Sequence, residues 1–147
     1  MLPATAPPQA ELASLAGQLA QHTQALELRG QALVAEWRQR FPKGSLPFTL
    51  VRLAGESNTL LRWRCSGAGC MPRGGRFELA DQPDWLAGLA PAVRSRILDF
   101  ERDRVALNYE YALAAYAHAR LVQLERQRLA LAQLRRGIGK PAALRRV

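Results

Sequence analysis

The longest stretch of the sequence without proline or glycine runs from Ala92 to Arg136. Proline and glycine are the residues that most often end or weaken a helix, so their absence predicts one long helix over residues 91–136, or two helices with a soft break. At about 1.5 Å per residue this helix would span roughly 65 Å. Any fold of the chain must therefore pack its other segments along this long helix.

The apolar residues of this segment change their distribution along its length. In the first part they form one stripe that includes Ile97, Phe100 and Leu107, as in a helix with one buried face. Between residues 105 and 124 apolar side chains occupy most faces, so we expect this part to be covered from more than one side. A second helix and a β-hairpin are the natural covers.

Residues 10–40 predict that second helix. Gly17 and Gly30 each weaken it by about 1 kcal/mol relative to alanine, and Pro42 ends it, because the residue before a proline disfavours helix. Its apolar residues recur at spacings of three, four and seven, which places them on one stripe: Leu12, Leu15, Leu19, Leu26, Leu33 and Trp37.

A β-hairpin is predicted between the two helices. Residues 48–53 and 59–64 are rich in β-branched or large apolar side chains, and residues 54–58 suit a hairpin loop. Because a lone hairpin is unstable in water, one face must pack on the helices. Strand alternation is expected to bury Val51, Leu53, Leu61 and Trp63 and to leave Arg52, Arg62 and Arg64 on the other face.

The remaining segments complete an α+β fold. Residues 66–76 are a glycine-rich loop, and Asp81 and Pro83 mark the start of a short helix that ends near Gly88. The predicted architecture is a long, mostly antiparallel helical hairpin with a two-stranded β-hairpin and a short connecting helix. Its expected organisation is a disordered tail, a single domain and a basic C-terminal extension, over residues 1–8, 9–136 and 137–147.

Charge is segregated along the chain, whose net charge is +9. Residues 41–76 carry six basic and one acidic residue, and residues 120–147 carry eight basic and one acidic residue. Residues 77–119 lie between these basic segments and carry four basic and seven acidic residues. Their charges alternate in sign from Arg94 to Arg104, which is typical of a solvated helix face with internal ion pairs.

Arginine supplies 19 of the 21 basic residues, and its guanidinium group binds phosphate through two parallel hydrogen bonds. We expect nucleic-acid phosphates to contact two groups of basic residues: Arg52, Arg62, Arg64, Arg73 and Arg76, and Arg126, Arg128, Arg135, Arg136 and Lys140. This hypothesis requires folding to gather both groups into one cationic strip without carboxylate neighbours. The alternative explanation is codon bias with a solvated helix end, whose cations complement the helix dipole.

The candidate metal ligands are few. Cys65 and Cys70 flank part of the glycine-rich loop, and His22 and His118 lie on different predicted helices. A structural zinc site usually needs two close pairs of ligands, so we expect no metal and no cofactor. The position of His118 in an apolar stretch indicates a core or boundary residue. Two cysteines are too few for a disulfide-stapled secreted scaffold, which favours a cytoplasmic protein with reduced thiols.

No catalytic constellation is apparent from the spacing of residues. Gly69 and Gly74 have the spacing of a phosphate loop, but the lysine and hydroxyl residues that bind phosphate and magnesium do not follow them. Arg73 and Arg76 could still hold a single phosphate group beside this loop. The protein is therefore expected not to be an enzyme.

Three short runs carry a resemblance to a known family: Leu46-Pro47-Phe48, Leu60-Leu61-Arg62-Trp63-Arg64, and Leu107-Asn108 in a long alanine-rich helix. They resemble an uncharacterised bacterial family of integrating conjugative elements and plasmids, some of whose members are labelled integrase regulator. The resemblance covers residues 10–136. It implies a mobile-element setting with DNA-linked regulation, and it carries over no catalytic residue.

The sequence thus predicts a non-enzymatic accessory protein of a mobile genetic element that binds nucleic acid through backbone phosphates. The alternative is a protein–protein adaptor, because a long Ala/Leu-rich helix can pair with a partner helix or with a second copy of itself. No window approaches the roughly 20 uninterrupted apolar residues that a bilayer requires, so we expect no membrane association.

Overall fold

The computed structural model describes residues 9–53, 59–66 and 77–139. These residues are mostly helical and include one two-stranded antiparallel sheet, which confirms the predicted long helix and β-hairpin. The elements follow in the order α1 (Gln9–Arg40), β1 (Phe48–Arg52), β2 (Leu61–Cys65), the 3-10 turn η1 (Leu79–Asp81), α2 (Pro83–Ala87) and α3 (Pro91–Gly139). The loop at 54–58, most of the glycine-rich loop and both chain ends lie outside the described residues.

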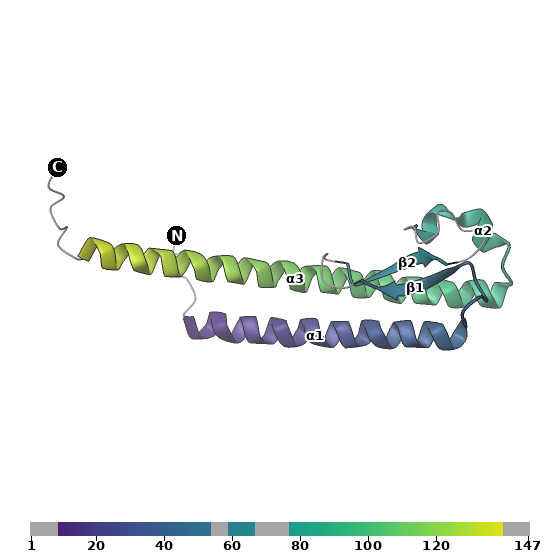
Figure 1. Ribbon diagram of the computed structural model, residues 1–147, viewed down its shortest axis with the longest axis horizontal. Helices are drawn as coiled ribbons and strands as arrows, with labels where there is room; N and C mark the ends of the chain where they lie inside the picture. Colours follow the sequence, from purple (N-terminus) through teal and green to yellow (C-terminus); the bar gives the residue numbers. More distant parts are fainter. Residues whose placement is uncertain (1–8, 54–58, 67–76, 140–147) are drawn as a thin grey trace, which may run out of the picture.

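The two long helices lie side by side and run in opposite directions (Figure 1). They are not joined by a short turn, because the sheet and α2 come between them in the sequence. The sheet packs on both helices near the end where α1 finishes and α3 begins, and α3 extends well beyond the first residue of α1 (Figure 1). Among the described helices, none combines the length and the apolar character needed to cross a membrane.

The boundaries of the helices differ from the predicted ones at two places. α3 continues through Gly137 to Gly139, since a single exposed glycine weakens a helix by about 1 kcal/mol without ending it. The residue preceding α2 is Gln82 rather than Asp81, which belongs to η1, while Pro83 takes the expected first position. The proposed C-terminal extension therefore begins inside the helix.

The two strands pair in a register that corrects one predicted strand face. Leu50 lies opposite Trp63, and Val51 lies opposite Arg62. Leu61 and Trp63 are buried as expected, but in β1 the buried residues are Phe48 and Leu50. Val51 therefore shares the outer face with Arg62 and Arg64, and Arg52 has the parity of the core residues. Because successive strand side chains point to opposite faces, a shift of one residue in the predicted alternation exchanged the buried and outer faces of β1.

An aromatic cluster fixes the sheet to both helices. The ring of Trp37 on α1 lies 4.9 Å from that of Trp63 and 5.1 Å from that of Phe100 on α3, both in edge-to-face geometry. Phe48 lies 5.2 Å from Trp63 on the same side of the sheet. Edge-to-face pairs add about 0.5–1.5 kcal/mol each beyond the area that they bury. The predicted core position of Trp63 is confirmed, since only 1% of it is exposed.

A buried ion pair lies beneath this cluster. Arg104 is 7% exposed and donates two hydrogen bonds to Glu101, from Nε at 2.7 Å and from Nη2 at 2.9 Å. Its Nη2 also reaches Glu78 at 3.2 Å, and Trp63 Nε1 donates to Glu101 at 2.7 Å. The expectation of a solvated charged face holds for Arg102, which pairs with Asp99 and Asp103, but it is wrong for Arg104, which the sheet covers.

Asn108 attaches the beginning of β2 to α3. Its Oδ1 accepts hydrogen bonds from the backbone N–H groups of Leu60, at 3.0 Å, and Leu61, at 2.8 Å, and its Nδ2 donates to the Leu61 carbonyl at 2.8 Å. One side chain thus satisfies three backbone groups at the edge of a two-stranded sheet.

The two glycines of α1 have different surroundings. A Cβ added to Gly30 would lie 2.9 Å from Cδ2 of the buried Leu60, whereas one added to Gly17 meets nothing within 4 Å. We expect Gly17→Ala to raise the free energy of unfolding by about 1 kcal/mol. Gly30→Ala should lower it by about 1 kcal/mol, because overpacking exceeds the gain in helix propensity. Chemical denaturation of both variants measures the difference, and an equal stabilisation would contradict the close approach at Gly30.

Candidate anion-binding cleft

A cleft of about 580 Å³ lies at the end of the molecule where α1 finishes. It is bounded by the last turn of α1, by the connection at residues 41–47 and by the outer face of the sheet. Phe41, Leu46 and Val51 provide an apolar floor, and Thr49 and Ser66 add hydroxyl groups. The cleft exists because the chain turns sharply after α1, where Gly44 has a φ of 89° that favours glycine.

Three cations line the cleft, and they come from three different parts of the chain. Arg38 belongs to the last turn of α1, Lys43 to the connection, and Arg64 to β2. None of the described residues that line the cleft is acidic. Within the described part of the chain, none of the three cations forms an ion pair, whereas the neighbouring Arg40 pairs with Glu36 at 3.6 Å. The cleft therefore concentrates positive charge that the described residues do not neutralise.

The polar groups of the cleft are oriented by the fold. Thr49 lies opposite Arg64 in the strand pairing, and its Oγ1 accepts a hydrogen bond from Trp37 Nε1 at 3.2 Å. Since the hydroxyl accepts from the indole, its own hydrogen remains available to a ligand oxygen. Two guanidinium groups, an ammonium group and a hydroxyl donor at one cleft suit an oxyanion such as a phosphate group.

Of the basic residues predicted in the hairpin region, Arg64 alone lines this cleft among those that the structure describes. Arg52 instead forms an ion pair with Glu27 on α1 at 3.8 Å. The Nε atom of Arg62 is buried and has no hydrogen-bond partner among the described residues. Arg73 and Arg76 lie outside the described residues.

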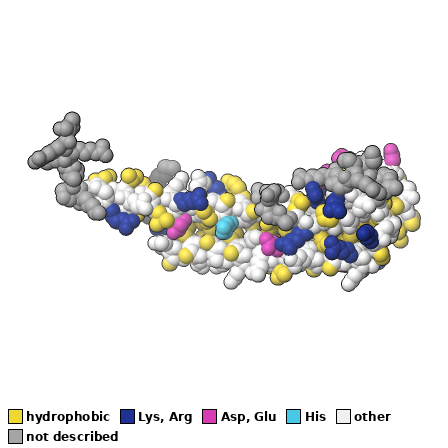
Figure 2. All heavy atoms as spheres, in the orientation of Figure 1, with side chains coloured by type: hydrophobic (Ala, Val, Ile, Leu, Met, Phe, Trp, Pro, Cys, Tyr) yellow, Lys and Arg dark blue, Asp and Glu magenta, His cyan; other side chains and the backbone are white. Residues whose placement is uncertain are grey.

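The second predicted group lies at the other end of α3. Arg126, Arg135 and Arg136 are exposed, Arg128 is half-buried, and Lys140 lies outside the described residues. The sheet contacts α3 near Glu101 and Asn108, so at 1.5 Å per residue the two basic groups are about 40 Å apart. Figure 2 shows the dark-blue side chains at the sheet end separated from those further along α3. The expected continuous cationic strip is therefore wrong for a single chain.

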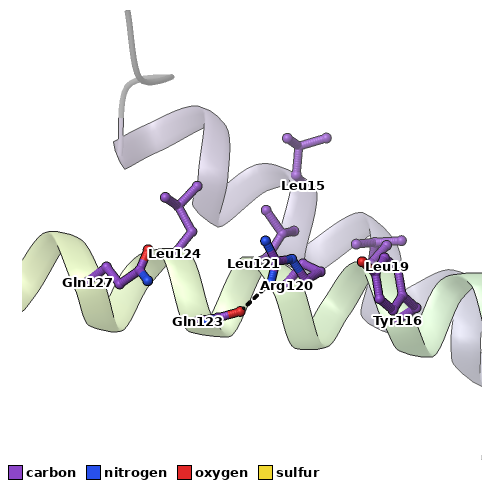
Figure 3. Close-up of a pocket in the computed structure, with 9 residues that line it drawn as sticks. Leu15, Leu19, Tyr116, Arg120, Leu121, Gln123, Leu124 and Gln127 are labelled. Atoms are coloured by element: carbon purple, nitrogen blue, oxygen red, sulfur yellow. Dashed lines mark hydrogen bonds between the residues drawn. The ribbon is translucent and has the colours of Figure 1, made fainter.

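A second hollow, of about 510 Å³, lies between the first turns of α1 and the middle of α3. Leu15, Leu19, Leu121 and Leu124 line it, and Arg120 lies at its edge with a hydrogen bond to Gln123 of 2.7 Å (Figure 3). Its lining is mostly apolar, so it offers contact area rather than a charged ligand site. Leu15 was expected in the buried stripe of α1 but is 45% exposed.

The remaining candidate ligands do not form a site. His118 is exposed rather than in the core, and among the described residues no three metal-ligating side chains lie close together. Cys65 is buried and disulfide-bonded, so the expectation of a reduced thiol is wrong for this residue; Cys70 lies outside the described residues.

Arg38 and Lys43 are not among the basic residues predicted from the sequence to bind phosphate. The signal that could have found them is the Pro42-Lys43-Gly44 turn, which reverses the chain and places the end of α1 beside the strands. Comparison with protein-family models, with curated proteins and with solved structures finds no match for this chain.

Proposed function

We propose that the protein is a non-enzymatic accessory protein that binds nucleic acid through backbone phosphates, with the cleft as the principal contact. The observation that carries this proposal is the convergence of Arg38, Lys43 and Arg64 on one cleft whose lining, over the part of the chain that the structure describes, includes no acidic residue. Phosphates that occupy the cleft release condensed counterions, which favours binding at low salt. The resemblance described above supplies the setting of this proposal, a mobile genetic element.

The basic end of α3 is a second candidate contact for the same polyanion. Residues 126–139 contain four arginines and no acidic residue, and three of the four, Arg126, Arg135 and Arg136, are exposed. This segment is a straight helix end rather than a cleft, and it can follow a phosphate backbone without enclosing it. The proposal therefore assigns it a supporting, sequence-independent contribution.

The proposal predicts a specific loss on neutralising the cleft. Arg38→Gln, Lys43→Gln and Arg64→Gln in one chain should weaken binding to random-sequence DNA about 10- to 100-fold near 100 mM salt. The slope of log affinity against log salt should fall by about 2 to 3, because each lost phosphate contact contributes about 0.9. Fluorescence anisotropy with single-stranded and duplex oligonucleotides over a salt series measures both quantities.

The matched control removes the same charge from the other group. Arg126→Gln, Arg135→Gln and Arg136→Gln should reduce affinity by less than the cleft variant, although the net charge of the two proteins is equal. A wild-type protein that does not bind either oligonucleotide at low salt would refute the proposal. A loss confined to the control variant would transfer the function from the cleft to the end of α3.

A further inference from the structure

The part of α3 that was expected to be covered from several sides is covered on one side. Ile97, Phe100, Leu107 and Ala114 are buried against the sheet and α1. On the same helix a second set of large apolar residues remains 46–83% exposed: Leu98, Val105, Tyr109, Leu113, Tyr116, Leu131, Leu134 and Ile138. We call this set the outer stripe.

The outer stripe has two parts along the helix, from Leu98 to Tyr116 and from Leu131 to Ile138, and the polar residues Arg120, Gln123 and Gln127 occupy the same face between them. Leu98, Tyr116 and Leu134 are 18 residues apart, which is about five turns of an α-helix, so they project in the same direction. Leu113 and Leu131 repeat the same spacing. At about 100° per residue the stripe lies roughly opposite Ile97 and Phe100, away from the face that packs on the sheet. Of its members, Tyr116 also lines the hollow between α1 and α3.

The outer stripe extends along α3 beyond the part of that helix that lies beside α1. Figure 1 shows α3 continuing past the first residue of α1, and Figure 2 shows yellow side chains on this continuation. From Leu98 to Ile138 the stripe spans about 60 Å. At about 100 Å² for each half-exposed side chain it offers roughly 800 Å², the area that a standard interface buries on each partner. Monomeric proteins rarely expose apolar patches larger than a few hundred Å².

We infer that the outer stripe pairs with the outer stripe of a second copy of this chain, with the two α3 helices antiparallel. Charge selects this occupant and this direction. Apart from Glu101 and Arg104, which pair beneath the sheet, residues 99–110 carry three acidic residues and one basic residue, whereas residues 126–137 carry four basic residues and no acidic one. An antiparallel pair with Leu98 opposite Ile138 of the second copy places these two segments side by side. A parallel pair would place the two acidic segments beside each other and the two basic segments beside each other.

One charge pair defines the register. Asp99 has a side chain 61% exposed and makes a 3.7 Å contact with Arg102 of its own helix. In the antiparallel pair Asp99 lies within one helical turn of Arg135 of the second copy, on the same flank of the stripe. The two basic groups that one chain holds about 40 Å apart would then lie at the same end of the assembly. The pairing does not depend on the ligand of the cleft.

Sedimentation equilibrium of the full chain tests the inference, with matched variants in the overhanging part of α3. Leu131 lies on the outer stripe and Leu129 lies on the opposite side of the helix, with 55% and 51% exposure. We expect a wild-type dimer whose dissociation constant rises about 100-fold in Leu131→Glu, since each dimer would bury two unpaired carboxylates. Leu129→Glu should change it less than about threefold.

A charge exchange tests the direction of pairing. Asp99→Arg alone and Arg135→Asp alone should each weaken the dimer about tenfold at low salt, and the double variant should restore it. Restoration occurs only where residue 99 of one copy faces residue 135 of the other. Each of three results would overturn the inference. The first is a wild-type chain that stays monomeric up to about 200 µM, on the order of 10⁻⁴ M. The others are equal effects of the two leucine substitutions and a double charge variant that dimerises as weakly as the single ones. A monomer would leave the stripe to a different partner, while the cleft would be unaffected.

Discussion

Arg104→Met is expected to lower the free energy of unfolding by about 3–5 kcal/mol, the usual cost of removing one partner of a buried ion pair. Methionine retains the length of the side chain, so lost packing is a small part of the effect. The main cost arises at Glu101, which is only 20% exposed and loses both hydrogen bonds from Arg104. Of the donors to Glu101 among the described residues, Trp63 Nε1 remains, and one hydrogen bond is too little for a carboxylate at that depth.

A second substitution separates charge from shape. Adding Glu101→Gln to Arg104→Met removes the unpaired charge but keeps an oxygen that can accept from Trp63 Nε1. The double variant should therefore recover about half of the lost stability. Urea denaturation monitored by tryptophan fluorescence measures the cycle. If the double variant is as unstable as the sum of the single ones, the two side chains do not act as a pair.

The contribution of Arg104 should not vary with pH near neutrality. The hydrogen bonding of Arg104 to the Glu101 carboxylate is the largest cause that raises the pKa of Arg104 above its usual value, against the opposing effect of burial. A cation whose pKa is raised on folding contributes stability at every pH below its unfolded value and loses it only as the pH rises through the folded value. For arginine that window is strongly alkaline, so the denaturation cycle is measured at neutral pH.

Sequence periodicity predicted the helices well, and the strand faces less well, for a physical reason. Pro42 follows the end of α1 and Pro91 begins α3, and the spacing of Ile97, Phe100 and Leu107 is that of one buried helix face. In β1 the residues Leu50 and Val51 are both apolar, so alternation alone does not say which of them is buried. The decision is made by Trp37, whose ring packs on Phe48, Trp63 and Phe100, and no local pattern encodes those contacts.

The cleft could be predicted only in part. Its cations are far apart in the sequence, and the turn after α1 brings them close together in space. Arg64 follows from the outer face of β2, but Arg38 belongs to a helix face that appears solvated in the sequence. The predicted merging of the two basic groups failed for the opposite reason. A helix as long as α3 keeps its ends apart however the rest of the chain folds.

Asn108→Leu is expected to lower the free energy of unfolding by about 3 kcal/mol. The substitution keeps the volume of the side chain but leaves the N–H groups of Leu60 and Leu61 and the carbonyl of Leu61 without their partner. Each backbone group that loses its hydrogen bond at a partly buried position costs about 1 kcal/mol or more. The effect should be greatest at the sheet, because Asn108 is its polar attachment to this part of α3.

A graded series distinguishes this role from general disruption of α3. Asn108→Asp retains both accepted hydrogen bonds and loses only the donor to the Leu61 carbonyl, so its cost should be about a third of that of Asn108→Leu. Gln133→Leu, at an exposed position of the same helix, should change stability by less than about 0.5 kcal/mol. Hydrogen exchange should accelerate in β1 and β2 of Asn108→Leu before it accelerates in α1. Because β1 and β2 carry Thr49 and Arg64, loosening these strands should also weaken anion binding at the cleft. Uniform acceleration of hydrogen exchange along α3 would contradict the role of Asn108 as a local attachment.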